Sequence, residues 1–360
     1  ALFSSIIRNA VDGVSTSVPD GSTTRIDVPG GTDATAAAFN VTTTHPRAPG
    51  FLTAHPCGEV PLVSMHNYGR GQVVAHSGIV PLDEAGGFCI TTHRATNLVV
   101  DVTGLFPTGG DFAAVEPTRW VDTRERPGRE PLRAGQQLRL DIDAVRAAAG
   151  IDGDPRAVAI SATAVEASAP GFLRVTTCGS SAATSNVNYD GPSASPNHVI
   201  VELDDAGAIC VETFADSHVL IDLFGVFDDD SGIDATAPRR LLDTRELGGR
   251  VGPESVTEVV VADPDDGPVP PGVVLNLTVV DPVGATFATA YPCADGRPPS
   301  SNLNAETGVA SNAAIVAPDD DGKVCVYSLA ASHLVVDLMG VAGDDFAGFR
   351  PIRALDTRSS

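Results

Sequence analysis

Short apolar runs separated by turn residues recur along the whole chain. They include FLTAHP at 51–56, HVIVEL at 198–203, VVLNLTVV at 273–280 and HLVVDL at 333–338, each bounded by Gly, Pro, Asn or Asp. Alternating or β-branched runs of this length are typical of strands, and turn clusters every eight to twelve residues or so are typical of a sandwich or barrel. Helical periodicity is confined to DIDAVRAAAG at 141–150 and to residues 1–12. The pattern predicts an all-β chain.

The chain repeats itself three times. GFLTAHPC at 50–57, GFLRVTTC at 171–178 and TFATAYPC at 286–293 each end on a cysteine, and a second cysteine follows 32 positions later. In phase with them recur NVT, SAT and NLT at 40–42, 161–163 and 276–278, then SMHN, SNVN and SNLN at 64–67, 185–188 and 301–304. Such self-similarity is the mark of a repeat architecture. We expect three units of roughly 120 residues.

The six cysteines allow fifteen pairings. One spacing used three times favours one bond inside each unit, and the alternative, metal binding, lacks a CxxC or Cys/His cluster beside each pair. Each bridge would contribute about 3 to 4 kcal/mol. Disulfides indicate an oxidising compartment, so we expect a secreted, extracellular or cell-surface protein. The expected bonds are Cys57–Cys89, Cys178–Cys210 and Cys293–Cys325.

A phrase ending in Asp-Thr-Arg also occurs three times, as PTRWVDTRE from 117, PRRLLDTRE from 238 and PIRALDTR from 351. Its aspartate follows that of the preceding D-x-x-G motif by 21, 21 and 19 positions, which is tighter than its distance to the next unit. We therefore assign it to the preceding unit, with domains at 1–126, 127–247 and 248–360, the third closed by the terminal strand. Arginine suits bidentate pairing with carboxylates. We expect a structural charge network, rather than the alternative of a ligand site, from Asp101, Arg119, Asp122 and Arg124, from Asp222, Arg240, Asp243 and Arg245, and from Asp337, Arg353, Asp356 and Arg358.

These motifs resemble a tandem repeat of secreted and wall-associated actinobacterial proteins, with the pattern P-x-R-L-x-D-T-R, G-F-L-T-x-Y-P-C, S-N-L-N and D-x-x-G-Y-F. The resemblance covers nearly the whole chain, and it implies a β-rich, disulfide-bonded surface module with no catalytic residues to carry over. The chain departs from it at Met65, at Ser161 and at GVA, 340–342. Together with the strand pattern, the repeat predicts three tandem antiparallel β-sandwich-like domains.

The formal net charge is −23, from 46 acidic and 23 basic residues. Such a charge argues against a nucleic-acid partner. No apolar run reaches 18 residues, so we expect no membrane span.

Isolated polar residues give weaker signals. Five histidines lie in the first unit at separations that match no zinc motif, so we expect surface or cross-strand roles; they are His45, His55, His66, His76 and His93. The acidic loops at 228–234 and 319–321 are either solvated turns or calcium sites, and no other cofactor is expected. The sequons at Asn40 and Asn276 are interpreted as structural asparagines.

Function is predicted only in outline. No nucleophile stands beside a base, and the distinctive residues recur as scaffold residues do, so we expect no enzyme. We expect a structural protein that forms a stiff rod, assembling head to tail through an apolar N-terminal segment at Leu2, Phe3, Ile6 and Ile7. The alternative is a carbohydrate-binding or cell-wall-binding adhesion module, although one Trp and four Tyr offer few stacking surfaces.

Overall fold

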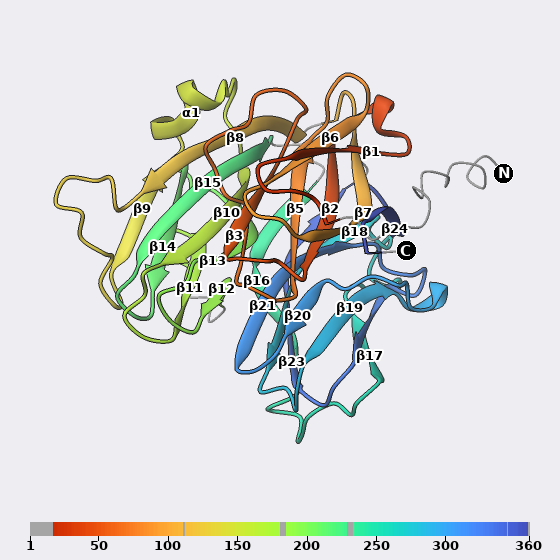
Figure 1. Cartoon of the computed structure of the whole chain (residues 1–360). Helices are drawn as coiled ribbons and strands as arrows, with labels where there is room; N and C mark the ends of the chain where they lie inside the picture. Colours follow the sequence, from red (N-terminus) through yellow and green to blue (C-terminus); the bar gives the residue numbers. More distant parts are fainter. Residues whose placement is uncertain (1–16, 111, 181–184, 229–232, 344, 359–360) are drawn as a thin grey trace.

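The computed structural model describes residues 17–110, 112–180, 185–228, 233–343 and 345–358 (Figure 1). Within these residues the chain forms 24 strands, one helix, α1 (Asp143–Ala149), and two 3-10 turns at Gly31–Asp33 and Cys293–Asp295. All strand pairs among them are antiparallel or isolated bridges. The all-β class is therefore confirmed, and α1 lies on the segment for which the sequence predicted a short helix.

Three four-stranded sheets each carry one disulfide, and we call them the disulfide sheets. Their inner strands hold the second cysteine of each pair, as in β6, which contains Cys89. In spatial order their strands are β1 (Thr23–Asp27), β6 (Gly87–Thr92), β3 (Gly50–His55) and β4 (His66–Tyr68); β9 (Gln137–Asp141), β14 (Ala208–Thr213), β11 (Gly171–Thr177) and β12 (Val187–Tyr189); and β17 (Ser255–Val260), β22 (Lys323–Ser328), β19 (Thr286–Pro292) and β20 (Leu303–Ala305).

The other three sheets meet in the middle of the molecule, and we call them the central sheets. Their strands are longer, and the inner ones are buried over most of their length, whereas the edge strand β24 is only partly buried. In spatial order they are β24 (Ala347–Asp356), β7 (Asn97–Pro107), β2 (Ala34–Thr44) and β5 (Val74–Pro81); β8 (Phe112–Asp122), β15 (His218–Phe227), β10 (Ala157–Val165) and β13 (Ser195–Glu202); and β16 (Ile233–Asp243), β23 (His333–Ala342), β18 (Gly272–Val280) and β21 (Val309–Val316).

The central sheets share their edge strands in a cycle. Strand β8 follows β7 in sequence but pairs with β15, β16 pairs with β23, and β24 returns from the end of the chain to pair with β7. In Figure 1, β24 lies beside β7, although the two strands are far apart in the sequence. The prediction that each Asp-Thr-Arg phrase closes the preceding unit is therefore wrong. The phrase opens the next unit, and the terminal copy completes the first.

The predicted boundaries suffer from the same error. Ends placed at 126 and 247 separate β8 and β16 from the sheets in which they pair. Spacing along the chain misled the assignment because it measures only how soon a strand follows. A strand that is close in sequence can still pair in a neighbouring sheet, and in the folded chain the edge of β7 is taken by β24.

Four large apolar cores hold the sheets together, and a fifth, small cluster of Tyr291, Cys325 and Tyr327 lies in the third disulfide sheet. Three of them are each lined by one disulfide sheet and one central sheet. A fourth draws on all three central sheets, with Phe106 packed 4.5 Å from Phe112 and 5.1 Å from Phe346 between ring centroids. The six small sheets thus form a ring-like arrangement in which the three central sheets line a common core and each disulfide sheet packs on one of them. Three separate tandem sandwiches, and a rod built from them, were wrong expectations.

Glycines of the D-x-x-G motif make room for the shared edge strands. A Cβ on Gly104 would lie 2.1 Å from the Phe346 ring, and one on Gly225 would lie 2.2 Å from the Phe112 ring. Each phenylalanine lies at the start of a crossing strand. Glycine is therefore required for the phenyl ring to lie against the neighbouring strand. The motif glycine is therefore needed for the crossing edge strand to pack in its place.

Candidate functional site

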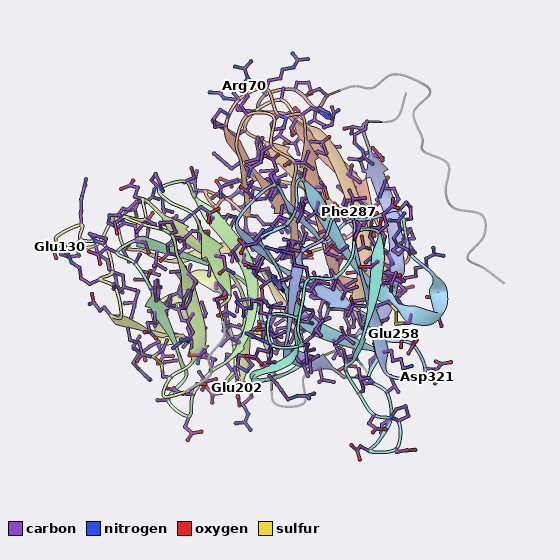
Figure 2. The ribbon with its side chains drawn as sticks, turned by 90° about the horizontal axis from the view of Figure 1, so that it is seen from below. Arg70, Glu130, Glu202, Glu258, Phe287 and Asp321 are labelled. Carbon is purple, nitrogen blue, oxygen red and sulfur yellow. A yellow bond between two sulfur atoms is a disulfide. The ribbon has the colours of Figure 1, made fainter. Side chains whose placement is uncertain are left out.

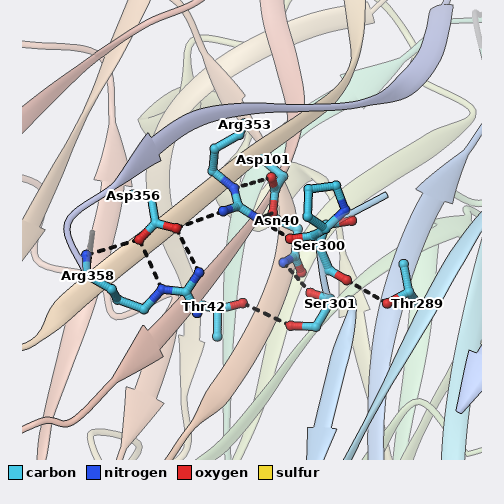
Figure 3. Close-up of polar contacts among 10 residues, drawn as sticks. Asn40, Thr42, Asp101, Thr289, Ser300, Ser301, Arg353, Asp356 and Arg358 are labelled. Atoms are coloured by element: carbon cyan, nitrogen blue, oxygen red, sulfur yellow. Dashed lines mark hydrogen bonds and ion pairs between the residues drawn. The ribbon is translucent and has the colours of Figure 1, made fainter. Parts of the chain in front are cut away.

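The crossing strand β24 is fastened to β7 by a partly buried ionic network (Figure 3). The Arg353 guanidinium donates from Nε to Asp101 Oδ1 at 2.6 Å and from Nη1 to Asp356 Oδ2 at 2.8 Å. Arg358 then donates to Asp356 at 2.7 Å. The side chain of Asp101 is 3% exposed, so its charge depends on Arg353 for compensation.

The same network occurs at the other two crossings. Each consists of one aspartate on the receiving strand and an Arg, Asp and Arg on the crossing strand. The sets are Asp222 with Arg119, Asp122 and Arg124, and Asp337 with Arg240, Asp243 and Arg245. All twelve predicted residues thus belong to ion-paired sets. The predicted grouping of Asp101 with Arg119 is wrong, because the edge strands are exchanged.

A β-bulge gives the network its geometry. Arg119 faces Asp222 and Val121 faces Ile221, so Trp120 is an extra residue on the crossing strand. Strict alternation would place positions three apart on opposite faces, and one inserted residue returns them to the same face. Arg119 and Asp122 can therefore pair at 3.1 Å. The same register shift recurs in β16 and β24.

Burial and pairing move the pKa values of these aspartates in opposite directions. Hydrogen bonds from Arg245 lower the pKa of Asp243 to about 2. Burial raises the pKa of Asp222 to about 6 despite the Arg119 guanidinium, and burial also raises the pKa values of Asp101 and Asp337. The receiving aspartates are therefore the electrostatically costly members of each set.

The three predicted disulfides are confirmed. Each joins the two cysteines separated by 32 positions, with 4.9 Å between their Cα atoms. The described residues contain no free cysteine. Each bond ties one inner strand of a disulfide sheet to a cysteine just beyond the end of the neighbouring inner strand, as Cys89 of β6 is tied to Cys57 after β3.

The asparagine of each sequon makes a hydrogen bond to a residue of another copy of the repeat. Asn40 Nδ2 donates to the carbonyl oxygen of Ser301 at 2.7 Å (Figure 3), and Asn276 Nδ2 donates to that of Ser185 at 2.9 Å. Both asparagines are buried, which agrees with the structural role predicted for them. In the third copy of this position the chain has Ser161, whose hydroxyl is buried without a hydrogen-bond partner.

The histidines fall into three groups. His45 and His93 are exposed, and the others that bond across strands include His55, with Nε2 2.9 Å from Thr91 Oγ1, and His218, with Nδ1 2.9 Å from Thr123 Oγ1. His66, His76 and His198, which we call the interior histidines, are buried, as are His55 and His218.

The three interior histidines come from two copies of the repeat. Burial lowers the pKa values of His66 and His198 to about 3, and that of His76 falls well below its usual range because of burial and the two neighbouring imidazoles. Sequence reasoning did not single out His198. His198 could have been found by aligning the copies, because the equivalent strand position in the third copy holds the small apolar residue Ala313.

Other predicted sites are less developed. The carboxylate of Asp319 accepts from the backbone N–H groups of Asp321 and Lys323, as in an ordinary turn. Among the described residues, no three His, Cys, Asp or Glu side chains are arranged to hold a metal ion. Residues 229–232 of the other acidic loop, and the predicted assembly contacts Leu2, Phe3, Ile6 and Ile7, lie outside the described residues.

Among the described residues, two of the cavities lie where the copies meet. The larger, about 690 Å³, is lined by three equivalent segments within 66–76, 188–196 and 303–311. The smaller, about 220 Å³, lies beside the network of Figure 3 and is lined by Arg297, Arg353 and Arg358 together with hydroxyl side chains. In the part of the chain that the structure describes, no helix is long and apolar enough to cross a membrane.

Comparisons with known proteins leave the family open. No family model matches the chain, and no curated protein matches it. Similar solved structures are a chain of the Sulfolobus turreted icosahedral virus (9% identity, 91% of this chain and 85% of that chain, TM-score 0.25), an archaeal virus protein with a triple jelly roll fold (10%, 91% and 85%, 0.24), and the CBM22-1–CBM22-2 tandem domain of Paenibacillus barcinonensis Xyn10C (12%, 65% and 94%, 0.17). Likenesses this weak carry no argument about this chain.

Proposed function

We propose that the protein is a secreted, non-catalytic structural protein of the cell surface or of an extracellular fibre. The observation that supports this most is where its distinctive residues are used. Three disulfides pin the disulfide sheets, and three partly buried Asp–Arg networks fasten the edge strands that are exchanged between the central sheets. Disulfides fit an oxidising compartment, and redundant cross-links fit a protein that must persist there.

The surface is compatible with this role. Glu130, Glu202, Glu258 and Asp321 lie at the periphery of the molecule (Figure 2) and are exposed, in keeping with the net charge of −23. Like charge keeps separate molecules apart, so any assembly needs a specific contact. In the proposal that contact is the apolar segment with Phe3 and Ile6, added to another subunit. Head-to-tail contacts of this kind give filaments when they do not close.

Electron microscopy of the purified full chain tests assembly, and fractionation of the source cells tests secretion. We expect filaments from the unaltered protein and none from the variant Phe3→Ser/Ile6→Ser, with both proteins folded by circular dichroism. Unaltered protein that stays monomeric at every concentration would contradict assembly. Recovery of the protein in the cytosol with free thiols would contradict the proposed location.

A further inference from the structure

The larger cavity contains a cluster of polar atoms that lack partners. His66 Nδ1, His76 Nε2, Asn67 Nδ2 and Asn188 Nδ2 are all buried without a hydrogen bond, and all four residues line this cavity. Both imidazoles are at least nine-tenths buried. A buried polar group without a partner costs about 1–3 kcal/mol, so four in one cavity indicate a place where something else supplies the bonds.

We propose that this cavity binds a neutral polyhydroxylated ligand, of the size of a mono- or disaccharide. Its volume of about 690 Å³ lies within the range of small-molecule sites. The inference does not depend on the proposed structural role, since a protein can hold a sugar whether or not it forms fibres.

The chemistry of the lining selects the ligand. The described lining contains no Lys or Arg, whereas Asp190 and Glu306 are present, so an anion would be repelled. The amide nitrogens of Asn67 and Asn188 can only donate, so they need acceptor oxygens, which an ammonium ion does not have. Hydroxyl groups donate and accept at once. They therefore satisfy the amides and the neutral imidazoles together.

Departures from the repeat orient the site. His66 occupies the position of Val187 and Leu303 in the other copies, as the strand pairs show. His76 precedes Ser77 where Asn312 precedes Ala313, and that asparagine is fully bonded, to the carbonyl of Asn302 among others. Scaffold residues recur in each copy, whereas these imidazoles occur once. His66 is also fixed by Thr43 Oγ1, 2.9 Å from its Nε2.

Saturation-transfer difference NMR on the full chain tests the proposal. The probes are neutral hexoses, pentoses and N-acetylhexosamines as free sugars, with short β-linked glycans as a second arm that separates free sugar from a chain end. We expect at least one probe to bind saturably. His66→Leu and His76→Asn, which introduce residues found in the sister copies, should each weaken it at least tenfold, and the exposed control His93→Asn should not.

A blocking variant keeps the test valid if the histidine variants fold poorly. Ser193 is an exposed lining residue, so Ser193→Trp should abolish binding while the melting temperature stays unchanged. Absence of binding by every neutral sugar overturns the proposal. So does binding that survives both the blocking and the histidine substitutions, which would place the sugar elsewhere.

Discussion

Replacing Arg353 by alanine should loosen the first copy of the repeat, although the residue lies near the end of the chain. Arg353 is 24% exposed and bonds Asp101 and Asp356 from β24, which pairs with β7. Its loss leaves the carboxylate of Asp101 buried and unpaired. Breaking a buried ion pair costs 3–5 kcal/mol, and the partial exposure of the arginine places the expected loss at about 3 kcal/mol.

Native-state hydrogen exchange with a peptide readout locates the loss. About 3 kcal/mol of local destabilisation accelerates exchange roughly 100-fold. We expect this in peptides covering 97–107 and 347–356, with 333–342 unchanged. Arg240→Ala is the matched control, because it breaks the equivalent network at β16 and should instead expose 333–342. If Arg353→Ala accelerates exchange in 333–342 and spares 97–107, the cyclic exchange of edge strands is refuted.

Three further perturbations follow from the same geometry. Gly104→Ala should lower the free energy of unfolding by about 2 kcal/mol in a denaturant titration because of the overlap with Phe346, while Gly249→Ala, in open space, should be neutral. His198 has a pKa of about 3 in the folded protein and near 6.5 in the unfolded chain, so the free energy of unfolding is highest above pH 6.5 and falls as the pH drops. Between pH 7 and pH 5 the unaltered protein should lose about 2 kcal/mol more of this free energy than His198→Leu. Equal losses would contradict a buried neutral imidazole. Removing one disulfide by Cys178→Ala with Cys210→Ala should cost about 4 kcal/mol by thermal unfolding, and an unchanged melting temperature would show that the bond constrains nothing.

The sequence was sufficient for what is local. Strand periodicity, the short helix at Asp143–Ala149 and the three disulfides could be predicted because each depends on a pattern or spacing within one copy. The partner of an edge strand could not, because β8 carries the same phrase as β24 and either would fit beside β7 by composition. The pairing depends on how three similar edge strands are distributed over three similar sheet edges in the folded chain.

The cavity was out of reach for a similar reason. His66 and Asn188 lie in different copies and meet only once the ring has closed. The bulge that brings Arg119 and Asp122 together also breaks the strict alternation by which side chains are assigned to the two faces of a strand. The useful signal was available but not used: a residue found once in a threefold pattern, such as His76, is a better functional candidate than one found three times.

The exchange of edge strands has a consequence for synthesis. The sheet of β7 stays open until the ribosome has made β24, which begins 240 positions after β7 ends (347 minus 107). A nascent chain therefore cannot complete the first copy of the repeat until nearly all of the remaining chain has been synthesised. Such a polypeptide is expected to complete its first unit later than one whose units fold one by one, which would suit the secretion that we propose.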